Sequence, residues 1–327
     1  MTELTAGVVG TGTMGGHHAR VYAEHRAVDL VGVHDADTDR ARSVAEEYDT
    51  IARSLDELLA RADLLSVAVP TEYHYDIASR AIDAGVHVLV EKPLVERRSR
   101  GEDLVERAAE EGVVLQVGHI ERFNPAVQCV ADIVADLDII AVDAHRLGPP
   151  VDRAIADSAV LDLMIHDLDV VCSLVDGDVT DVSATGTEGG EYATATVSFD
   201  GGIVGQFTAS RVTQQKVRRL SITAAECRVN VDYADQTVHV HRRSVPEYVE
   251  RDGDVRFRHE SVVERPTVDN GEPLKRELDS FIAAAREGMT PEVTGDEALQ
   301  ALALARRIDA LATDDADEQT VASLGRH

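Results

Sequence analysis

The sequence predicts two domains, an N-terminal α/β domain on a doubly wound parallel sheet and a C-terminal α+β domain on an antiparallel sheet. The chain has 327 residues, which is too long for one ordinary domain and about right for two. Residues 1–123 alternate apolar runs with amphipathic stretches, whereas residues 124–327 contain consecutive runs in which apolar and polar residues alternate. We therefore expect one domain at 1–123 and another at 124–327.

The first domain should contain short, continuously apolar strands, each followed by a helix. We expect strands at residues 6–9, 28–33, 64–69, 86–90 and 113–117. We expect helices at residues 13–25, 39–48, 55–62, 77–84 and 98–111. Gly85 and Gly112 end the last two helices, because glycine accepts the left-handed conformation that stops a helix. Strands that are apolar on both sides indicate a parallel sheet covered on both faces.

The second domain should contain a sheet framed by helices. We expect helices at residues 126–135, 159–174, 273–286 and 295–311. We expect strands at residues 139–144, 179–185, 193–199, 203–209, 217–223, 227–231 and 237–240. The period of two and glycine turns such as Asp200-Gly201-Gly202, with no helices between most of these strands, indicate antiparallel pairing.

Acidic residues dominate the charge of the chain. Asp and Glu number 60 against 32 Lys and Arg, which gives a net charge of −28. Such a charge repels nucleic acid and anionic membranes, so we expect neither as a partner. The chain has three lysines, Lys92, Lys216 and Lys275. An acidic protein with few lysines is typical of halophiles; a GC-rich genome also replaces lysine by arginine, but it does not explain the excess of acid.

Cysteine usage and hydropathy predict a reduced, cytoplasmic protein. Cys129, Cys172 and Cys227 lie far apart, which indicates neither a disulfide framework nor a zinc site, and we expect no metal. No run reaches the roughly 18 apolar residues of a membrane helix, and the first ten residues lead directly into a strand.

A glycine-rich turn follows the first predicted strand. Gly10, Gly12 and Gly15 fit the pattern G-x-G-x-x-G, and Thr13 and Met14 begin the next helix. The glycines permit a tight turn and let the backbone approach a pyrophosphate at the helix N-terminus. In this strand–helix context the pattern predicts a Rossmann domain that binds a dinucleotide, although a plain strand–helix turn is the alternative.

The end of the second strand carries the residue that should select the cofactor. Asp35 lies 25 residues after Gly10, where an acid accepts hydrogen bonds from the adenosine ribose. A 2′-phosphate would meet negative charge there, so NAD is favoured over NADP. The alternative is that Asp35 only caps the turn or the next helix, and Arg40 and Arg42 would soften the discrimination between NAD and NADP.

Glu91-Lys92-Pro93 lies at the carboxyl end of a predicted parallel strand, where open α/β sheets bind ligands. Lys92 is a lysine in a chain that otherwise uses arginine, and an ammonium group can donate to an alkoxide with a tunable pKa. The alternative is an ordinary surface lysine at the strand end. We also predict a cis Lys92–Pro93 bond, partly because a matching family motif is known.

Asp162 and His166 lie four residues apart on one face of a predicted helix in the second domain. A carboxylate and an imidazole at this spacing can act together, one orienting a hydroxyl and the other moving its proton. The alternative is an exposed surface pair. Because the helix is otherwise apolar, we expect a partly buried face and a substrate that binds between the domains.

These residues, in this order and spacing, resemble the Gfo/Idh/MocA oxidoreductases, which include inositol, glucose-fructose and UDP-sugar dehydrogenases. The matching pieces are Gly10 to Gly15 with His18, Val69-Pro70-Thr71 with His74, Glu91-Lys92-Pro93, and Asp162 with His166. The resemblance implies that Lys92, Asp162 and His166 are the catalytic set.

The same resemblance implies further roles. Pro70, Thr71, His74 and Glu91 would contact the cofactor, with Glu91 near the nicotinamide ribose. The C-terminal sheet would be open on one face and would carry the contacts of a homo-oligomer, either a dimer or a tetramer.

A finer resemblance concerns residues 118–125 and 146–149, which look like the branch containing UDP-N-acetylglucosamine 3-dehydrogenases. It implies that His119, Arg122, Asn124 and Arg146 line the substrate site. No separate motif demands a nucleotide diphosphate. Four basic residues are candidates to bind the diphosphate, with surface charges of the sheet as the alternative interpretation: Arg211, Lys216, Arg218 and Arg219. An inositol or free-sugar dehydrogenase therefore remains the alternative.

Taken together, the motifs predict an NAD-dependent dehydrogenase acting on a secondary alcohol of a sugar. His166 would take the hydroxyl proton, Lys92 would stabilise the alkoxide and Asp162 would orient the hydroxyl. An exchange of roles between His166 and Lys92 is the alternative. Two rivals remain. One is a non-catalytic dinucleotide sensor, which has no need for the catalytic set, and the other is an enzyme that regenerates a tightly held cofactor within each turnover.

Overall fold

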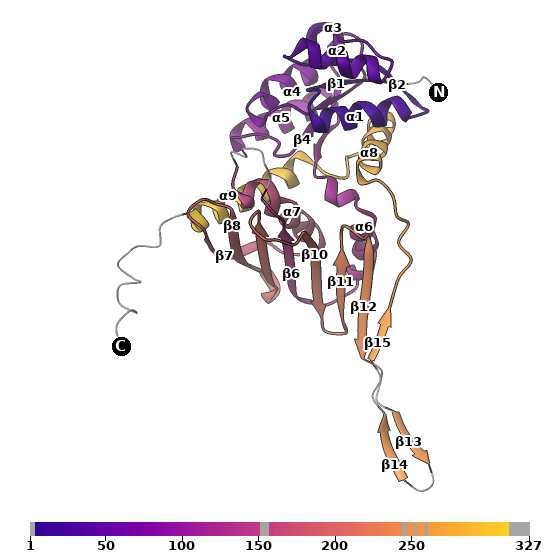
Figure 1. The fold of residues 1–327 in the computed structure, drawn as a ribbon, viewed down its shortest axis with the longest axis vertical. Coiled ribbons are helices and arrows are strands. Elements are labelled where there is room, and N and C mark those ends of the chain that lie inside the picture. Colours follow the sequence, from indigo (N-terminus) through magenta and orange to yellow (C-terminus); the bar gives the residue numbers. More distant parts are fainter. Residues whose placement is uncertain (1–3, 151–156, 244–246, 252–253, 259–260, 314–327) are drawn as a thin grey trace, which may run out of the picture. The chain divides into compact units, whose positions relative to one another are not determined.

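The computed structural model describes residues 4–150, 157–243, 247–251, 254–258 and 261–313. The chain divides into two units, residues 1–123 with 271–302, and residues 124–270 with 303–327 (Figure 1). The chain passes from the first unit to the second after Phe123. The sequence assigned everything beyond this point to one domain, whereas residues 271–302 group with the first unit.

The sheet of the first unit is parallel, as predicted. Its strands are β1 (Leu4–Val9), β2 (Val28–His34), β3 (Leu64–Val67), β4 (His87–Glu91) and β5 (Leu115–Gly118). Their order is β2-β1-β3-β4-β5, and every neighbouring pair is parallel. Because the strands run the same way, their carboxyl ends share one edge, and that edge carries the glycine turn, Asp35 and Lys92.

Helices connect these strands. They are α1 (Thr13–Glu24), α2 (Thr38–Glu47), α3 (Leu55–Leu59), α4 (His74–Asp83) and α5 (Arg98–Glu111), with 3-10 turns η1 (Thr71–Tyr73) and η2 (Ile120–Phe123). Gly112 caps α5 with a φ of +67°, the left-handed stop expected from the sequence. The α/β alternation therefore follows the predicted pattern, with small shifts at the ends of elements.

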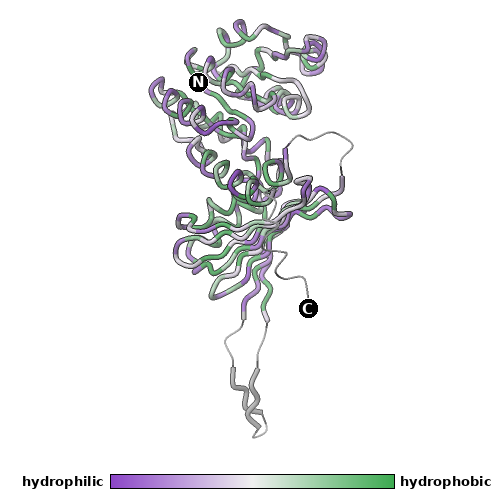
Figure 2. The backbone as a smooth tube through the Cα atoms, turned by 90° about the vertical axis from the view of Figure 1, so that its left-hand side faces the viewer, coloured by the Kyte–Doolittle hydropathy of each residue, from purple (hydrophilic) through white to green (hydrophobic). Residues whose placement is uncertain are grey.

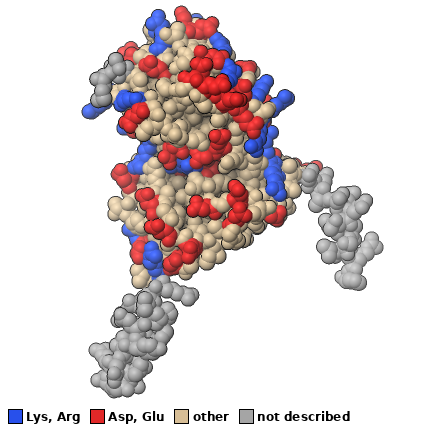
Figure 3. Space-filling model, turned by 180° about the vertical axis from the view of Figure 1, so that it is seen from behind, with Lys and Arg blue, Asp and Glu red and all other residues tan. Residues whose placement is uncertain are grey.

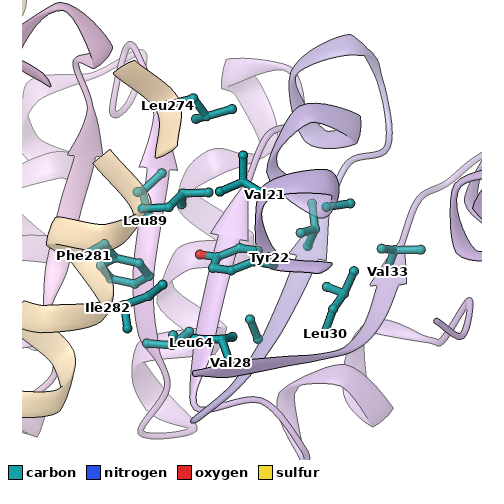
Figure 4. Packing of buried hydrophobic residues seen from close by; sticks show 14 of the residues in the cluster. Val21, Tyr22, Val28, Leu30, Val33, Leu64, Leu89, Leu274, Phe281 and Ile282 are labelled. Carbon is teal, nitrogen blue, oxygen red and sulfur yellow. The ribbon is translucent and has the colours of Figure 1, made fainter. Parts of the chain in front are cut away.

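Helix α8 (Pro273–Glu287) explains why the late segment joins the first unit. Its apolar face buries Leu274, Leu278, Phe281 and Ile282 in the same cluster as Tyr22 of α1 (Figure 4). Each large side chain that is fully buried contributes roughly 1.5–3 kcal/mol. Helix α9 (Gly295–Thr313) then continues from the first unit into the second. The sequence predicted both helices but assigned them to the second domain, whereas α8 packs within the first unit.

The second unit is built on a mixed sheet of eight strands. They are β6 (Ile139–Leu147), β7 (Val179–Gly186), β8 (Tyr192–Phe199), β9 (Val204–Ser210), β10 (Val217–Ala224), β11 (Cys227–Asp232), β12 (Thr237–Arg243) and β15 (Ser261–Glu264). Their order is β15-β12-β11-β10-β6-β9-β8-β7. All pairs are antiparallel except β6 with β9. Burial alternates along strands such as β8. Figure 2 shows hydrophilic and hydrophobic residues intermixed along the strands of this sheet.

Two helical segments of this unit matter for the site. Helix α6 is Pro125–Val134, and α7 is Ile165–Leu174. The sequence predicted one helix over 159–174, but Val160–Met164 form a π-helical turn before α7 begins. Within the described residues, the second unit also contains a separate hairpin, β13 (Glu247–Arg251) with β14 (Asp254–Arg258), and a 3-10 turn, η4 (Asp200–Gly202).

Charge is spread over the surface. Figure 3 shows acidic side chains across the face it presents, interspersed with basic ones. Among the residues that the structure describes, no helix combines the length and the apolar character that crossing a bilayer requires.

Candidate active site

The glycine turn of the first unit is shaped for close approach of a ligand. Gly10 has a φ of +89°, and a Cβ there would lie 2.4 Å from the carbonyl oxygen of Ala68. A Cβ at Gly15 would lie 1.7 Å from the carbonyl oxygen of Gly10. Gly12 precedes α1 without any side-chain cap and has open space where its Cβ would be. The N-terminus of α1 is therefore open to an anion such as a pyrophosphate.

A cavity of about 510 Å³ extends from this turn along the ends of β1, β2 and β3. Its lining includes Gly12, Asp35, Arg40, Pro70 and Tyr73. The volume lies in the range of small-molecule sites, and the wall combines apolar surface with a few polar groups. The residues present therefore fit the adenosine half of a dinucleotide. Thr71 is half-buried in η1, beside this wall.

Asp35 is buried at the end of this cavity and accepts five hydrogen bonds. They come from Thr11 N (2.7 Å), Thr11 Oγ1 (2.9 Å), Asp37 N (2.8 Å), Arg40 Nε (3.1 Å) and Arg40 Nη2 (2.7 Å). Burial by itself raises the pKa of the carboxyl, but the bonds from Arg40, Thr11 and Asp37 outweigh it and hold the pKa well below its usual range. Asp35 is therefore a carboxylate held in a fixed position, at the place where we predicted the adenosine ribose of the cofactor to bind.

His74 ties together the loops after β3 and β4. Its Nε2 lies 2.8 Å from the carbonyl oxygen of Val69, and its Nδ1 lies 3.0 Å from that of Pro93. The side chain is buried, and burial lowers its pKa although both carbonyls favour the charged form. His74 thus holds the segment after Lys92 in place. The Lys92–Pro93 bond is cis, as predicted.

Glu91 is held in place by a chain of hydrogen bonds through buried side chains. His18 Nε2 lies 2.9 Å from Glu91 Oε1, and His18 Nδ1 lies 3.0 Å from Ser66 Oγ, which is also 3.0 Å from the hydroxyl of Tyr22. Glu277 of α8 completes a group whose ligand atoms lie within 4.8 Å of one another. A histidine bonded directly to a carboxylate needs no ion, so we interpret the group as support for Glu91.

Lys92 is half-buried just after β4, and two further predicted residues of the first unit, His119 and Arg122, follow the neighbouring strand β5. His119 is buried, and burial together with the charges of Lys92 and Arg122 lowers its pKa to about 3. Arg122 Nη2 donates to the carbonyl oxygen of Glu292 (3.2 Å) and to Glu297 Oε1 (3.3 Å). His119 is therefore neutral and close enough to Lys92 to feel its charge. Arg122 also contacts Glu297 at the start of α9.

In the second unit, Asp162 and His166 lie on the π-helical turn and the first turn of α7, and both are half-buried. Arg211, just after β9, donates from Nη2 to Asp162 Oδ2 (3.1 Å). The same guanidinium donates to the carbonyl oxygens of Asp157 (2.7 Å) and Ser158 (3.0 Å). Arg211 thereby fixes both the carboxylate and the beginning of the π-helical turn. Such turns occur frequently at functional sites.

Two residues that the resemblance placed in the substrate site have internal partners. Arg146 is buried and forms a bidentate pair with Asp167, at 2.8 Å from Nε to Oδ2 and 2.8 Å from Nη2 to Oδ1. Asn124 accepts from Ala126 N at the start of α6 and donates to the carbonyl oxygen of Tyr233, both at 3.1 Å. These contacts fix Arg146 against α7, which carries Asp167, and place Asn124 at the N-terminus of α6.

The structure also shows contacts that sequence reasoning missed. Arg211 and Asp162 are 49 residues apart in the chain, and His18 and Glu91 are 73 apart. No spacing rule connects such pairs. The one available signal was that His18 accompanies the glycine motif in the resemblance to the family.

Two family models match the chain. One describes an oxidoreductase family with an NAD-binding Rossmann fold and matches residues 4–119. The other describes the GFO/IDH/MocA C-terminal domain and matches residues 141–230. Together they cover parts of both units.

Known proteins resemble the chain over most of its length. It is 36% identical over 248 residues to UDP-N-acetylglucosamine 3-dehydrogenase of Acidithiobacillus ferrooxidans, covering 74% of this chain and 78% of the relative. A solved structure of UDP-N-acetylglucosamine 3-dehydrogenase GnnA from the same species matches with a TM-score of 0.85 and 31% identity, covering 96% of this chain and 99% of that one. Inositol 2-dehydrogenase of Rhizobium meliloti is 27% identical and covers 91% of this chain and 94% of its own.

Proposed function

This chain belongs to the Gfo/Idh/MocA family of NAD-binding oxidoreductases, and we propose that it oxidises the 3-hydroxyl of a UDP-sugar such as UDP-N-acetylglucosamine. The protein is a dehydrogenase with NAD as its cofactor. The specific substrate is supported by the 36% identity to a UDP-N-acetylglucosamine 3-dehydrogenase over 74% of the chain.

The observation that supports a catalytic function is that each unit carries part of the predicted catalytic set, Lys92 in the first unit and Asp162 with His166 in the second. Lys92 follows β4 at the ligand-binding edge of the parallel sheet, and its backbone is held by His74 through Pro93. Asp162 and His166 share a half-buried face at a π-helical turn that Arg211 fixes. A dinucleotide sensor needs the glycine turn but none of these three residues.

In the proposed mechanism, each residue has a separate task at one hydroxyl. When bound, NAD supplies the acceptor for the hydride. The imidazole of His166 takes the hydroxyl proton, and the ammonium of Lys92 stabilises the negative charge that develops on the oxygen. Asp162 orients the hydroxyl, and Arg211 keeps the carboxylate of Asp162 in place. Residues held by such partners start close to the productive geometry.

A smaller polyol is the second candidate, and the basic residues of the second unit favour it. Arg211 contacts Asp157, Ser158 and Asp162. Arg218 Nη1 donates to the carbonyl oxygen of Leu147 (2.6 Å), and Arg219 Nε donates to Asp232 Oδ2 (3.3 Å). Three of the four basic residues proposed for a diphosphate thus have partners within the chain. Inositol dehydrogenases are also among its relatives.

A substrate panel separates these functions. The purified protein, with NAD, is mixed with UDP-N-acetylglucosamine, UDP-glucose, free N-acetylglucosamine and myo-inositol, and NADH formation is followed. We expect kcat/KM to be highest for UDP-N-acetylglucosamine. A higher value for myo-inositol would transfer the assignment to the polyol, and no turnover with any compound would favour the sensor. Cofactor released on denaturing fresh protein would reveal an enzyme that retains it.

A further inference from the structure

We propose that Arg40 sets the balance between NAD and NADP by occupying Asp35 until a cofactor binds. The inference goes beyond the sugar substrate and needs only the dinucleotide site of the first unit. It follows from the hydrogen bonds that the carboxylate of Asp35 accepts.

The acceptor positions of Asp35 are already filled. Its Oδ1 accepts from Asp37 N and Arg40 Nη2, and its Oδ2 accepts from Thr11 N, Thr11 Oγ1 and Arg40 Nε. A carboxylate offers about four lone-pair sites, so five donors leave no room for a ribose hydroxyl. Two ribose hydroxyls can bind Asp35 only if some of these donors leave.

The five donors differ in how readily they can leave. Those of Thr11 and Asp37 belong to the turns on either side of the carboxylate, and two of these three are backbone amides. The other two belong to a side chain that is 50% exposed, whereas Asp35 is 6% exposed. A half-exposed arginine exchanges its partner for water at little cost. Arg40 is therefore the group that a ribose would displace.

The two cofactors place opposite demands on this pair. NAD presents a 2′-hydroxyl, which competes with Arg40 for lone pairs of Asp35. NADP presents a 2′-phosphate, which needs cations rather than acceptors and can take the guanidinium in a bidentate contact. Arg40 lines the same cavity as Asp35, so the guanidinium is in position for either outcome. It should weaken NAD binding and strengthen NADP binding.

Neighbouring charges do not alter this conclusion. Asp37 Oδ1 caps α2 by accepting from Asp39 N and Arg40 N, both at 3.1 Å, and Asp76 lies on the cavity wall. Both carboxylates repel a 2′-phosphate whether or not Arg40 is present. Arg42 provides a matched control, because it lies on the same helix and pairs with Asp39 at an exposed site (2.8 Å).

The test measures binding of NAD and of NADP by isothermal titration calorimetry, without any sugar. The proteins are the wild type, Arg40→Ala and the control Arg42→Ala. For Arg40→Ala we expect the Kd for NAD to fall and the Kd for NADP to rise, with the ratio changing by about tenfold, which corresponds to about 1.4 kcal/mol. Arg42→Ala should shift neither Kd by more than about twofold, since it removes only an exposed pair.

Opposite shifts of the two constants support the proposal, since loss of structure would weaken both. Shifts in the same direction, or no shift in either, would overturn it. Arg40→Lys adds a second check. It keeps a positive charge for a phosphate but loses the bidentate contact with Asp35, so NAD should bind more tightly while NADP binding stays within about threefold of the wild type. Because no substrate is present, failure here would leave the dehydrogenase assignment untouched.

Discussion

The two units each contain a bidentate arginine–carboxylate pair, and the pairs differ chiefly in burial. In the first unit Arg40 faces Asp35, and in the second Arg146 faces Asp167. In both pairs Nε contacts Oδ2 and Nη2 contacts Oδ1. The two carboxylates are similarly buried, with Asp35 6% and Asp167 3% exposed, but Arg40 is 50% exposed whereas Arg146 is 5% exposed.

The same geometry therefore serves two purposes. A buried charge whose partner is removed has no water to replace it, so Arg146 and Asp167 must stay together. Arg146 also lies over the ring of Tyr233, 5.2 Å from its centroid, which fixes it further. An exposed arginine can leave its partner for a ligand. Burial, and not hydrogen-bond geometry, decides which pair is structural and which is available to a cofactor.

The largest expected difference between the pairs is in stability. Arg146→Met should lower the free energy of unfolding by about 3–5 kcal/mol, because it leaves Asp167 as an unpaired buried charge. Arg40→Met should lower it by no more than about 1 kcal/mol. Urea unfolding of the two variants beside the wild type measures both values.

The double variant Arg146→Met/Asp167→Leu sharpens this test. Replacing both partners with apolar side chains removes the unpaired charge and should recover most of the lost stability. Equal losses for Arg146→Met and Arg40→Met would show that burial does not distinguish the pairs.

A buried histidine extends the comparison to pH. The pKa of His119 is lowered to about 3, first by burial and then by the charges of Lys92 and Arg122. An ordinary histidine in the unfolded chain has a pKa of about 6.5, so between pH 3 and 6.5 the unfolded state binds the extra proton. Stability from this residue is complete above pH 6.5 and is lost as the pH falls.

Between pH 6.5 and 5.5 this linkage predicts a loss of about 1 kcal/mol. His119→Gln should lose about that much less than the wild type over the same interval, as measured by urea unfolding. His74 and His87, whose pKa values are also lowered by burial, contribute equally to both proteins. Parallel curves for the two proteins would mean that His119 is protonated in the folded state.

Salt should have a smaller effect on stability, and it should act on the exposed charges but not on the buried Arg146–Asp167 pair. The net charge of −28 destabilises the folded chain by self-repulsion, and salt screens exposed charges over about 3 Å at 1 M. We expect the thermal midpoint to rise in 1 M KCl by roughly 2–4 °C for each kcal/mol of repulsion removed. The penalty of Arg146→Met should persist in salt. An unchanged midpoint would count against a halophilic protein.

The sequence predicted the strands and turns of the first unit well, because residues that are neighbours in the sequence specify them. The positive φ of Gly10 follows from a glycine at a fixed place in the turn, whereas the cis Lys92–Pro93 bond was predicted partly from the family motif that it matches. The strands of the second unit were also predictable from their period of two, but the parallel pairing of β6 with β9 was not, because strand order is not encoded in that period.

The candidate site could be predicted only in part, because contacts between residues far apart in the sequence determine which polar side chains already have partners. Arg146 and Asn124 carry a family-like pattern that does not show their internal partners: Arg146 pairs with buried Asp167, and Asn124 caps α6 and donates to the carbonyl oxygen of Tyr233. A sequence shows that a polar residue is present but not whether another residue already satisfies it. The same applies to α8, whose apolar face was evident although its packing partner, Tyr22, was not.

The most direct test of the dehydrogenase mechanism is Lys92→Arg, measured by turnover and by NAD binding on the same preparation. The variant keeps the positive charge but loses the compact, titratable ammonium. We predict that kcat falls by roughly 10²–10⁴-fold, the range for lost acid–base catalysis, while the Kd for NAD changes little. Near-normal turnover would show that Lys92 is only an electrostatic anchor and would contradict the mechanism.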